Sequence, residues 1–320
     1  MRVVFWLSVA IGAYVYIAYP LILWIVTRRS ARTSRNEALT PRVSLVIAAF
    51  NEEKLIEAKL QNSLSLDYPR DRLEILVASD GSTDRTDEIV GRFREQGVVL
   101  HRIEGRRGKT RALNQTVPLT TGEILVLSDA NTFYRPDALR KLTRHFTDRS
   151  VGAVSGDVRL IDSADEYAAS EGMYYRYERW LQTLESRLAS IVGADGGMYA
   201  LRRALFQPPA PTVIVDDFVI SMTVATGGHR VLYDPEAIAI EQGTLSGREE
   251  WHRKVRIVAG GIHALKMREG VPTWRRPLLL WSYTSHKLLR WLLPVFLIAG
   301  FVASGALAAA PFYRDRKSVV

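Results

Sequence analysis

Acidic and amide side chains directly follow apolar runs of this sequence, and Ser128-Asp129-Ala130-Asn131 is the clearest case. The four residues before it, ILVL at 124–127, read as a strand buried on both faces. Asp129 and Asn131 could share one hard cation there, because both side chains offer oxygen ligands. Turn formation is the alternative, since Asp and Asn also favour turns. The stretch alone leaves both interpretations open.

Two further polar clusters occur in the same setting. Residues 51–53, NEE, follow the apolar run 43–50, and residues 79–84, SDGSTD, follow the run 73–78. Open α/β sheets bind ligands beside the carboxyl ends of their strands. Turns at the amino ends of the same runs lack such clustered acids. The three clusters together favour one nucleotide-binding crevice with a metal at its mouth.

A basic loop, GRRGKTR, occupies residues 105–111. The helix predicted at 110–114 would direct its N-terminal amides and its dipole toward an anion. Lys109 or Arg111 could then meet a diphosphate. The spacing of the glycines does not match a P-loop. A solvated basic loop is the alternative interpretation.

Asp216 and Asp217 follow another apolar run, at 213–215. One of the two carboxylates could point into a site while the other supports it. A buried carboxylate near another negative group has a raised pKa and can accept a proton. Either residue could also cap a helix expected at 219–224, and the two roles are compatible. Upstream, the glycines of GADGGMY at 193–199 permit a close approach of backbone to a ligand.

The elements that would position these residues alternate between strands and helices along the chain. Such alternation predicts an α/β fold with a mostly parallel, doubly wound sheet. A long helix is expected at 165–190, and its tyrosines with Trp180 predict either core or membrane-proximal packing or a sugar-binding platform. The strands are expected at 43–50, 73–78, 98–102, 124–127 and 151–160.

The composition points to a membrane surface rather than to nucleic acid. The chain has 320 residues, and 43 Lys and Arg against 34 Asp and Glu give a formal net charge of +9. The cations cluster beside apolar runs, as expected for residues near a membrane. The chain has no Cys, so it can form neither a disulfide nor a thiolate site.

Two apolar stretches are long enough to cross a bilayer. Residues 3–26 carry no charged side chain and exceed the apolar length of a signal peptide, which is the alternative assignment. The second stretch, at 291–312, precedes a basic tail. By the positive-inside rule, the cations that flank the two stretches place residues 27–290 in the cytoplasm. The basic tail would then lie outside the cytoplasm, which conflicts with that rule. Either the tail is short enough to be tolerated, or the second stretch forms a hairpin.

With these residues assembled, the chain resembles the family 2 glycosyltransferases of GT-A fold, of the membrane-embedded kind that includes polysaccharide synthases. The resemblance covers roughly residues 42–261. SDAN matches the Asp-x-Asp metal motif with Asn131 in place of the last Asp, an exchange that removes one negative charge. The matching stretches are AAFNEE at 48–53, SDGSTD at 79–84, GKTRALN at 108–114, SDAN at 128–131, the loop 193–203 and the Asp216-Asp217 pair.

The resemblance implies the GT-A nucleotide-diphospho-sugar transferase fold with flanking transmembrane helices. The implied order is a transmembrane helix at 1–27, a basic linker at 28–41, a cytoplasmic GT-A domain at 42–265, an interfacial amphipathic segment at 266–290, a transmembrane segment at 291–313 and a tail at 314–320.

The resemblance also implies a role for each matching residue. Asp217 would be the catalytic base, and Asp129 and Asn131 would hold Mg²⁺ or Mn²⁺. Gly196, Gly197 and Asp216 would face the acceptor. The residues implied to contact the nucleotide-sugar, with Asp80 at the base, are Ala49, Asn51, Glu53, Asp80, Lys109, Arg111, Asp129 and Arg256.

The implied activity is inverting transfer of a sugar from a nucleotide-diphospho-sugar, expected to be a UDP-sugar, to a polysaccharide, glycan or lipid-linked acceptor. The enzyme would lie in the inner (plasma) membrane among its lipids, bind no nucleic acid and be compatible with partners in a membrane complex. Processive members carry Gln-x-x-Arg-Trp, where this chain has Arg253-Lys254-Val255-Arg256-Ile257. Arg256 is kept, but the Trp that helps hold a growing chain is absent. Strong processivity is therefore not expected.

Two other classes remain compatible with the sequence. A nucleotidyltransferase also pairs carboxylates with a metal, and release of pyrophosphate instead of a nucleoside diphosphate would identify it. A non-catalytic membrane scaffold on a degenerate transferase fold is the other class, and turnover would exclude it.

Overall fold

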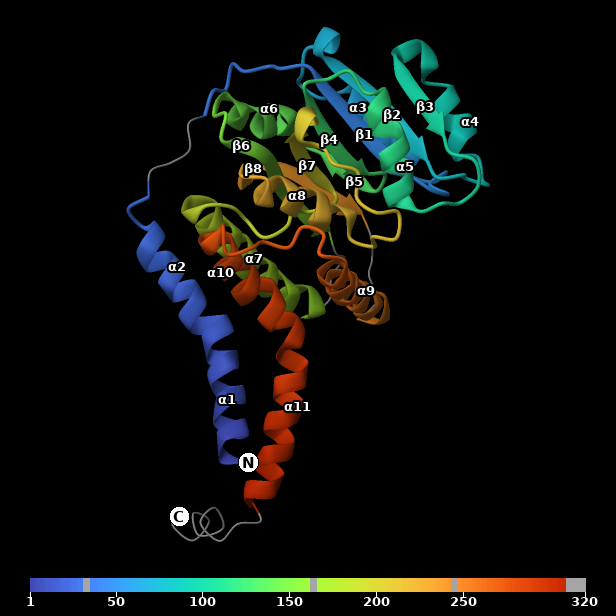
Figure 1. Ribbon diagram of the computed structural model, residues 1–320. Helices are drawn as coiled ribbons and strands as arrows, with labels where there is room; N and C mark the ends of the chain where they lie inside the picture. Colours follow the sequence, from blue (N-terminus) through green and yellow to red (C-terminus); the bar gives the residue numbers. More distant parts are fainter. Residues whose placement is uncertain (31–34, 162–165, 243–246, 309–320) are drawn as a thin grey trace.

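The computed structural model describes residues 1–30, 35–161, 166–242 and 247–308. Its sheet domain, the part that contains β1 to β8, is built on an eight-stranded sheet with strand order β3-β2-β1-β4-β7-β6-β8-β5 (Figure 1). The strands are β1 (Val43–Ala49), β2 (Leu73–Ser79), β3 (Val98–Arg102), β4 (Ile124–Asp129), β5 (Thr132–Tyr134), β6 (Val151–Ile161), β7 (Met198–Arg202) and β8 (Arg230–Gln242).

The first four strands form the predicted parallel half of the sheet. β1 pairs in parallel with both β2 and β4, and β2 pairs in parallel with β3. The helices α3 (Ile56–Leu64), α4 (Thr86–Gly91) and α5 (Lys109–Thr116) connect them, as the alternation of the sequence predicts. β7 then runs antiparallel to β4, so the sheet is mixed beyond this point. The mostly parallel α/β prediction is confirmed for the half that forms the crevice.

Helices cover both faces of this sheet, because successive strand residues point to opposite sides. Leu45 and Ile47 pack with residues of α3, α4 and α6 (Ala138–Thr143) in one buried cluster. Val46 packs with residues of α5 and α8 (Asp216–Thr226) in a second cluster on the other face. Both faces are therefore buried, which explains why β1, β2 and β4 are mostly apolar.

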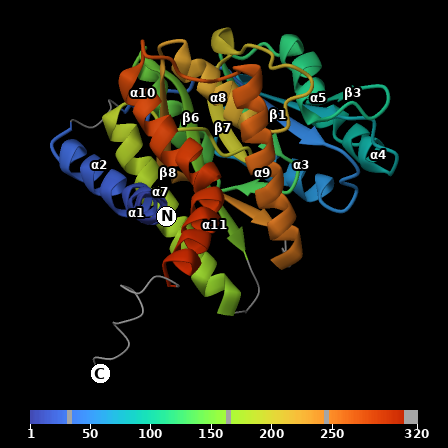
Figure 2. The same ribbon diagram turned by 60° about the horizontal axis from the view of Figure 1, so that its bottom comes forward.

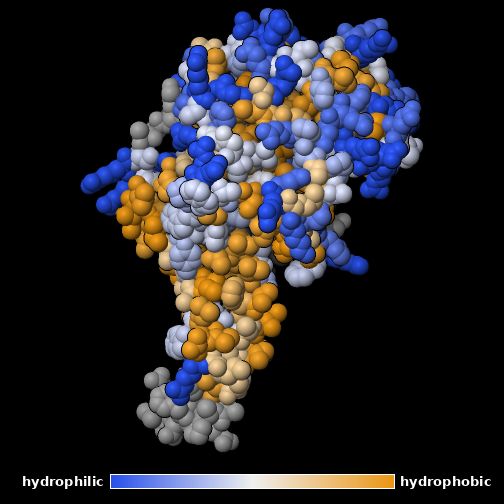
Figure 3. Space-filling view, in the orientation of Figure 1, coloured by the Kyte–Doolittle hydropathy of each residue, from blue (hydrophilic) through white to orange (hydrophobic). Residues whose placement is uncertain are grey.

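Two long apolar helices extend from the sheet domain side by side (Figure 1). The first consists of α1 (Arg2–Ala13), a π-helical turn at Tyr14–Ala18 and α2 (Tyr19–Thr27). The second consists of α10 (Pro277–Ser282), a π-helical turn at Tyr283–Leu288 and α11 (Leu289–Ala308). Both are long and apolar enough to cross a membrane, and only 22% and 17% of their most apolar windows are buried within the chain. Figure 3 shows the resulting hydrophobic surface below the more hydrophilic sheet domain.

The second apolar helix begins earlier than the sequence predicts. It begins at Pro277, inside the segment 266–290 that was expected to lie at the membrane interface, instead of at Trp291. His286, Lys287 and Arg290 therefore lie within the helix rather than before it. The end of the predicted span, 309–313, and the predicted tail 314–320 lie outside the described residues, as do 31–34 of the linker.

Polar contacts attach both apolar helices to α7 (Glu166–Leu188), which lies beside α2 (Figure 2). Glu185 accepts hydrogen bonds from the hydroxyl of Tyr19 at 2.7 Å and lies 2.8 Å from Nδ1 of His286. Glu178 accepts from Arg290 at 2.5 Å. Tyr174 also contacts Arg290, so this part of the tyrosine-rich helix packs against the second apolar helix.

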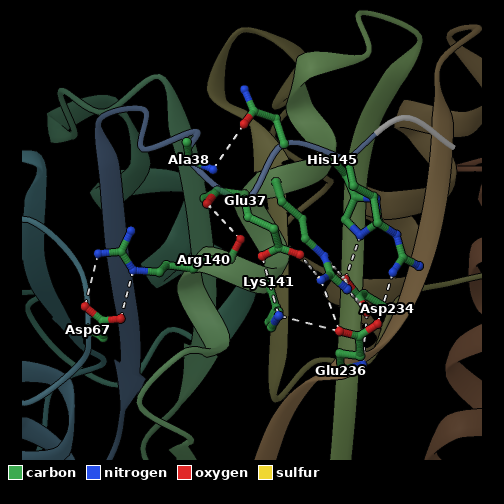
Figure 4. Close-up of polar contacts among 12 residues, drawn as sticks. Glu37, Ala38, Asp67, Arg140, Lys141, His145, Asp234 and Glu236 are labelled. Atoms are coloured by element: carbon green, nitrogen blue, oxygen red, sulfur yellow. Dashed lines mark hydrogen bonds and ion pairs between the residues drawn. The ribbon is translucent and has the colours of Figure 1, made fainter.

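A second polar cluster attaches the segment after α2 to the far edge of the sheet (Figure 4). Arg144, only 1% exposed, bonds to fully buried Asp234 at 2.7 Å and to Glu236 at 3.1 Å. His145 bonds to the same Asp234 carboxylate at 2.7 Å. Glu37, from the segment after α2, also pairs with Arg144. These contacts hold the segment after α2 against the sheet domain.

Candidate active site

A cavity of about 760 Å³ opens beside the carboxyl ends of β1, β2 and β4. The three polar clusters of the sequence meet at this edge, as predicted from parallel strands. Loops from the antiparallel half and the helix α9 (Gly247–Met267) form the other wall. The predicted site residues that line the cavity are Ala49, Asp80, Lys109, Asp129, Asn131, Gly196, Gly197, Asp216, Asp217 and Arg256.

Three predicted donor-site residues do not line the cavity: Asn51, Glu53 and Arg111. Asn51 adopts a left-handed conformation (φ 56°), and its amide oxygen accepts from the backbone of Thr83 at 2.8 Å. Glu53 accepts from Arg85 at 3.3 Å. These residues connect the loops after β1 and β2. The helix α3 begins only at Ile56, so the acids of this cluster lie before its first turn.

Asp80 fixes the shape of the basic loop. Its two carboxylate oxygens accept the backbone N–H groups of Arg107 and Gly108, each at 2.8 Å. The preceding strand turns at Gly81 (φ 68°), where a Cβ atom would lie 2.6 Å from the carbonyl carbon of Gly105. The loop can therefore approach only because residue 81 has no side chain. The loop held in this shape leads into α5. Lys109 is the first residue of that helix and lines the cavity.

Lys109 lies among carboxylates contributed by distant parts of the sequence. Its Nζ is 2.6 Å from Oδ1 of Asp129 and 3.7 Å from Oδ2 of Asp216. Burial alone would lower the pKa of Lys109, but the charges of Asp216 and Asp129 outweigh it and raise that pKa. Lys109 therefore stays protonated and presents a fixed positive charge at the centre of the site.

Asp217 is positioned by the first turn of α8. Its Oδ1 accepts the backbone N–H of Phe218 at 2.8 Å. The helix begins at Asp216, so both acids occupy its first turn and neither is the residue before the helix, which is Val215. Burial raises the pKa of Asp217, although Lys109 opposes the shift. Burial likewise raises the pKa of Asp216, which is only 5% exposed. A carboxylate with a raised pKa is suited to accept a proton.

The glycine-rich turn presses directly against this acid. A Cβ atom on Gly196 would lie 2.7 Å from Oδ2 of Asp217, closer than real side chains come. Asp195 holds the turn, because its Oδ1 accepts the N–H of Gly197 at 3.0 Å and its own N–H donates to Ser155 at 3.0 Å. The turn thus brings a cavity-lining backbone next to Asp217.

The metal motif forms the turn between β4 and β5. Lys59, which is fully buried, lies beneath it and donates to Ser128 at 2.8 Å and to the carbonyl of Thr132. Among the described residues, no group of three or more His, Asp or Glu side chains is arranged to hold a metal ion by itself. Asp129 and Asn131 nevertheless fit a hard cation, because Mg²⁺-type sites use one or two protein oxygens and complete their shell with substrate phosphates and water.

Several lining residues were not selected from the sequence. Asp195 was noted only as part of its glycine-rich turn, and Glu241 follows the apolar alternation at 237–240 in the same way as the selected clusters follow their strands. On α9, Arg253 and Ile257 line the cavity beside the predicted Arg256. Gly260 lets α9 approach the segment before Asp216, since a Cβ atom there would lie 2.9 Å from the side chain of Val215.

The model of the glycosyl transferase family 2 matches residues 44–207 of this chain, which include β1 to β7 and all of the first three polar clusters. The chain belongs to glycosyl transferase family 2. The predicted family is therefore confirmed, and the fold around the cavity is the one expected for it.

Named relatives and solved structures agree with this membership. The chain is 28% identical over 242 residues to "Probable glycosyltransferase YdaM" of Bacillus subtilis, covering 70% of this chain and 56% of that protein. It is 27% identical over 281 residues to a poly-beta-1,6-N-acetyl-D-glucosamine synthase of Staphylococcus aureus, covering 81% of this chain and 64% of the synthase. The chain thus spans about three fifths of the length of these relatives.

One solved structure matches almost the whole chain. The mannosyltransferase PcManGT from Pyrobaculum calidifontis, in complex with GDP-Man and Mn²⁺, superposes with a TM-score of 0.75 and 26% identity over 98% of this chain and 94% of that one. The S. aureus TarS 1–349 structure, at 14% identity and a TM-score of 0.53, shares the fold. The GT-A-like α/β fold is confirmed by these likenesses.

Proposed function

We propose that this protein is a membrane-bound inverting glycosyltransferase that moves a sugar from a nucleotide-diphospho-sugar to a glycan, polysaccharide or lipid-linked acceptor. The observation that carries the proposal is that Asp217, Lys109 and Asp129 line one cavity of a family 2 fold. A proton acceptor and groups for a diphosphate therefore meet in the same cavity. Displacement at the sugar's anomeric carbon requires this combination.

The reaction breaks one bond and forms another at that carbon. Asp217 removes the proton of the acceptor hydroxyl, whose oxygen attacks the anomeric carbon from the side opposite the diphosphate. The bond to the diphosphate oxygen breaks, and the nucleoside diphosphate leaves with the electron pair. Inversion of configuration follows from this single displacement. Lys109, together with Arg256 on α9, neutralises the charge that develops on the leaving group.

A divalent cation, Mg²⁺ or Mn²⁺, is proposed to be held by Asp129 and Asn131. It would supply further charge stabilisation for the leaving diphosphate. The archaeal mannosyltransferase, whose structure contains Mn²⁺ and GDP-Man, supports metal dependence. The donor is proposed to be a UDP-sugar, with GDP-mannose as the alternative that this relative suggests.

The two apolar helices are proposed to cross the inner (plasma) membrane with the catalytic part in the cytoplasm. Their length and exposure support this placement, since the side chains of α1 and α11 are largely uncovered by the rest of the chain. Membrane attachment would suit a lipid-linked or growing glycan acceptor. Ile257 stands at the cavity wall where processive relatives have Trp, so transfer of one or a few sugars is proposed.

The test is a donor panel with the detergent-purified protein. UDP- and GDP-sugars are each incubated with and without Mn²⁺ or Mg²⁺, and both nucleoside diphosphate and pyrophosphate are measured. The proposal predicts metal-dependent release of nucleoside diphosphate from one donor. Release of pyrophosphate would indicate nucleotidyl transfer instead, and turnover unaffected by a chelator would contradict the metal dependence.

A further inference from the structure

An acid from a distant part of the chain holds the side chain of Asn131. Nδ2 of Asn131 donates to Oε1 of Glu241 at 3.2 Å. The contact is built into the sheet, because β5 pairs antiparallel with β8 and Thr132 lies opposite Glu241. Asn131 and Glu241 both line the cavity together with Asp129. The sheet register therefore brings Glu241 next to the metal motif although 110 residues separate it from Asn131.

The chemistry of this contact decides how the amide is oriented. A carboxylate is only an acceptor, so Asn131 must turn its NH₂ group toward Glu241. The amide oxygen then faces away from the acid. Only that oxygen can bind a cation, since the NH₂ group has no lone pair available for a metal. Glu241 thus selects the one orientation in which Asn131 can serve as a ligand.

The charge balance of the site gives Glu241 a second role. Lys109 lies 2.6 Å from Asp129 and offsets its charge, and Asn131 is neutral. These three residues alone would provide no net negative charge for a divalent cation. Glu241 adds one carboxylate beside the position where the family motif has its second Asp. Glu241 thereby supplies, from another strand, the negative charge that the sequence motif lacks.

We propose that Glu241 is a positioning residue for the divalent cation, which orients the Asn131 amide and supplies the carboxylate charge that the exchange of Asp for Asn removes. This inference rests on the metal-dependent function proposed above. It predicts that residues 131 and 241 act as a pair in which one acid and one amide are required.

The experiment measures Mn²⁺ binding, by the electron paramagnetic resonance signal of free Mn²⁺, to the full chain in detergent with UDP or with GDP. E241Q should weaken Mn²⁺ binding by about 10–100-fold, as loss of residues that orient metal ligands does. The double variant N131D/E241Q, which moves the acid to position 131, should recover most of the loss. E88Q, which removes an exposed carboxylate on α4, is the matched control and should bind as the wild-type chain does.

Each outcome has a definite meaning. E241Q that binds Mn²⁺ as tightly as the wild-type chain would overturn the role of Glu241 alone. A double variant that stays as weak as E241Q would overturn the charge exchange between the two positions. A wild-type chain that binds no Mn²⁺ with either nucleotide would contradict the proposed metal site and this inference together. Thermal melting without metal checks folding; if E241Q melts early, E241D replaces it and should also bind Mn²⁺ more weakly.

Discussion

At the scale of single residues, the site depends on charged side chains whose interactions are strengthened by burial. Asp216, Asp217 and Lys109 are close together in a cavity that removes much of their water, and their pKa values shift accordingly. Burial raises the pKa of both carboxyls, while the carboxylates keep Lys109 protonated. Proton acceptance and diphosphate binding are thereby assigned to different residues of one cavity.

The raised pKa of Asp217 predicts the pH dependence of transfer. Asp217 accepts a proton only when it is ionised, and burial shifts its pKa above the usual value of about 3.9 for Asp. The transfer rate should therefore fall as the pH drops through this raised pKa, and it should rise toward neutral pH. A profile of kcat/KM from about pH 3.5 to 8 measures this, with nucleotide binding at each pH as the control. A rate that falls only at the usual pKa of about 3.9 would refute the assignment of Asp217.

The chemical role of a residue could be predicted from the sequence more readily than its contacts could. The positions of Asp129, Asp217 and Lys109 in the cavity agree with their motifs. Asp80 matches a motif implied to meet the nucleotide base, yet both its oxygens hold the backbone of residues 107–108. No local pattern shows that bond, because it depends on how closely the turn at Gly81 lets the basic loop approach. Glu241 escaped prediction for the same reason, since its partner lies on another strand.

At the scale of elements, the turn at 193–197 and the start of α8 form one unit. The turn is bonded to Ser155 on β6 and to Ser221 on α8, so it has fixed anchors on both sides. Its Gly196 leaves no room for a side chain beside Asp217. The position of the proposed base is therefore set by a turn as much as by its own helix.

Gly196→Ala should lower kcat with little effect on donor binding. The added methyl group would lie 2.7 Å from Oδ2 of Asp217 and must displace that carboxylate or the turn. A shift of about 1 Å at a reacting group can cost about 10²-fold in rate. Steady-state kinetics and nucleotide affinity separate the two effects. Gly91→Ala, in open space on α4, is the matched control. Wild-type kcat in Gly196→Ala would show that the turn does not position Asp217.

The elements themselves differ in how readily the sequence predicts them. β1, β2 and β4 are mostly apolar, and helices follow β1 and β2, so their pattern identifies them. β5 has only three residues, and β8 contains Asp234 and Pro235 and pairs with β6 through register shifts. Neither strand therefore shows a clear alternation of apolar and polar residues. Tertiary pairing, rather than local pattern, defines these two strands.

At the scale of the whole molecule, the catalytic sheet is attached to the apolar helices at separate places. α7 bonds to both helices through Glu178 and Glu185. The segment after α2 is held by Arg144 at the far edge of the sheet. These attachments limit how the catalytic part can turn relative to the two proposed membrane spans. The apolar helices were evident from composition, whereas the start of the second at Pro277 was not, because His286, Lys287 and Arg290 interrupt its apolar pattern.

Arg144→Met should destabilise the protein. The substitution leaves the fully buried Asp234 without its arginine, and breaking a buried ion pair costs about 3–5 kcal/mol. Thermal unfolding in detergent should show a Tm lowered by at least about 6 °C. The matched control is Arg140→Met, which breaks the exposed pair with Asp67 shown in the same view (Figure 4) and should change the Tm far less. Equal Tm values for the two variants would contradict this account of the cluster.

The most direct test of the central claim compares the wild-type chain with Asp217→Asn. Release of nucleoside diphosphate in the presence of acceptor is measured beside Mn²⁺-dependent binding of the same nucleotide. Asp217→Asn keeps the size of the side chain but cannot accept the proton, so transfer should fall by about 10²–10⁴-fold. Nucleotide binding should persist, because Lys109 and Asp129 are unchanged, and the surface variant Asp67→Asn should behave as the wild-type chain. An Asp217→Asn protein with wild-type transfer would contradict the proposed mechanism at its centre.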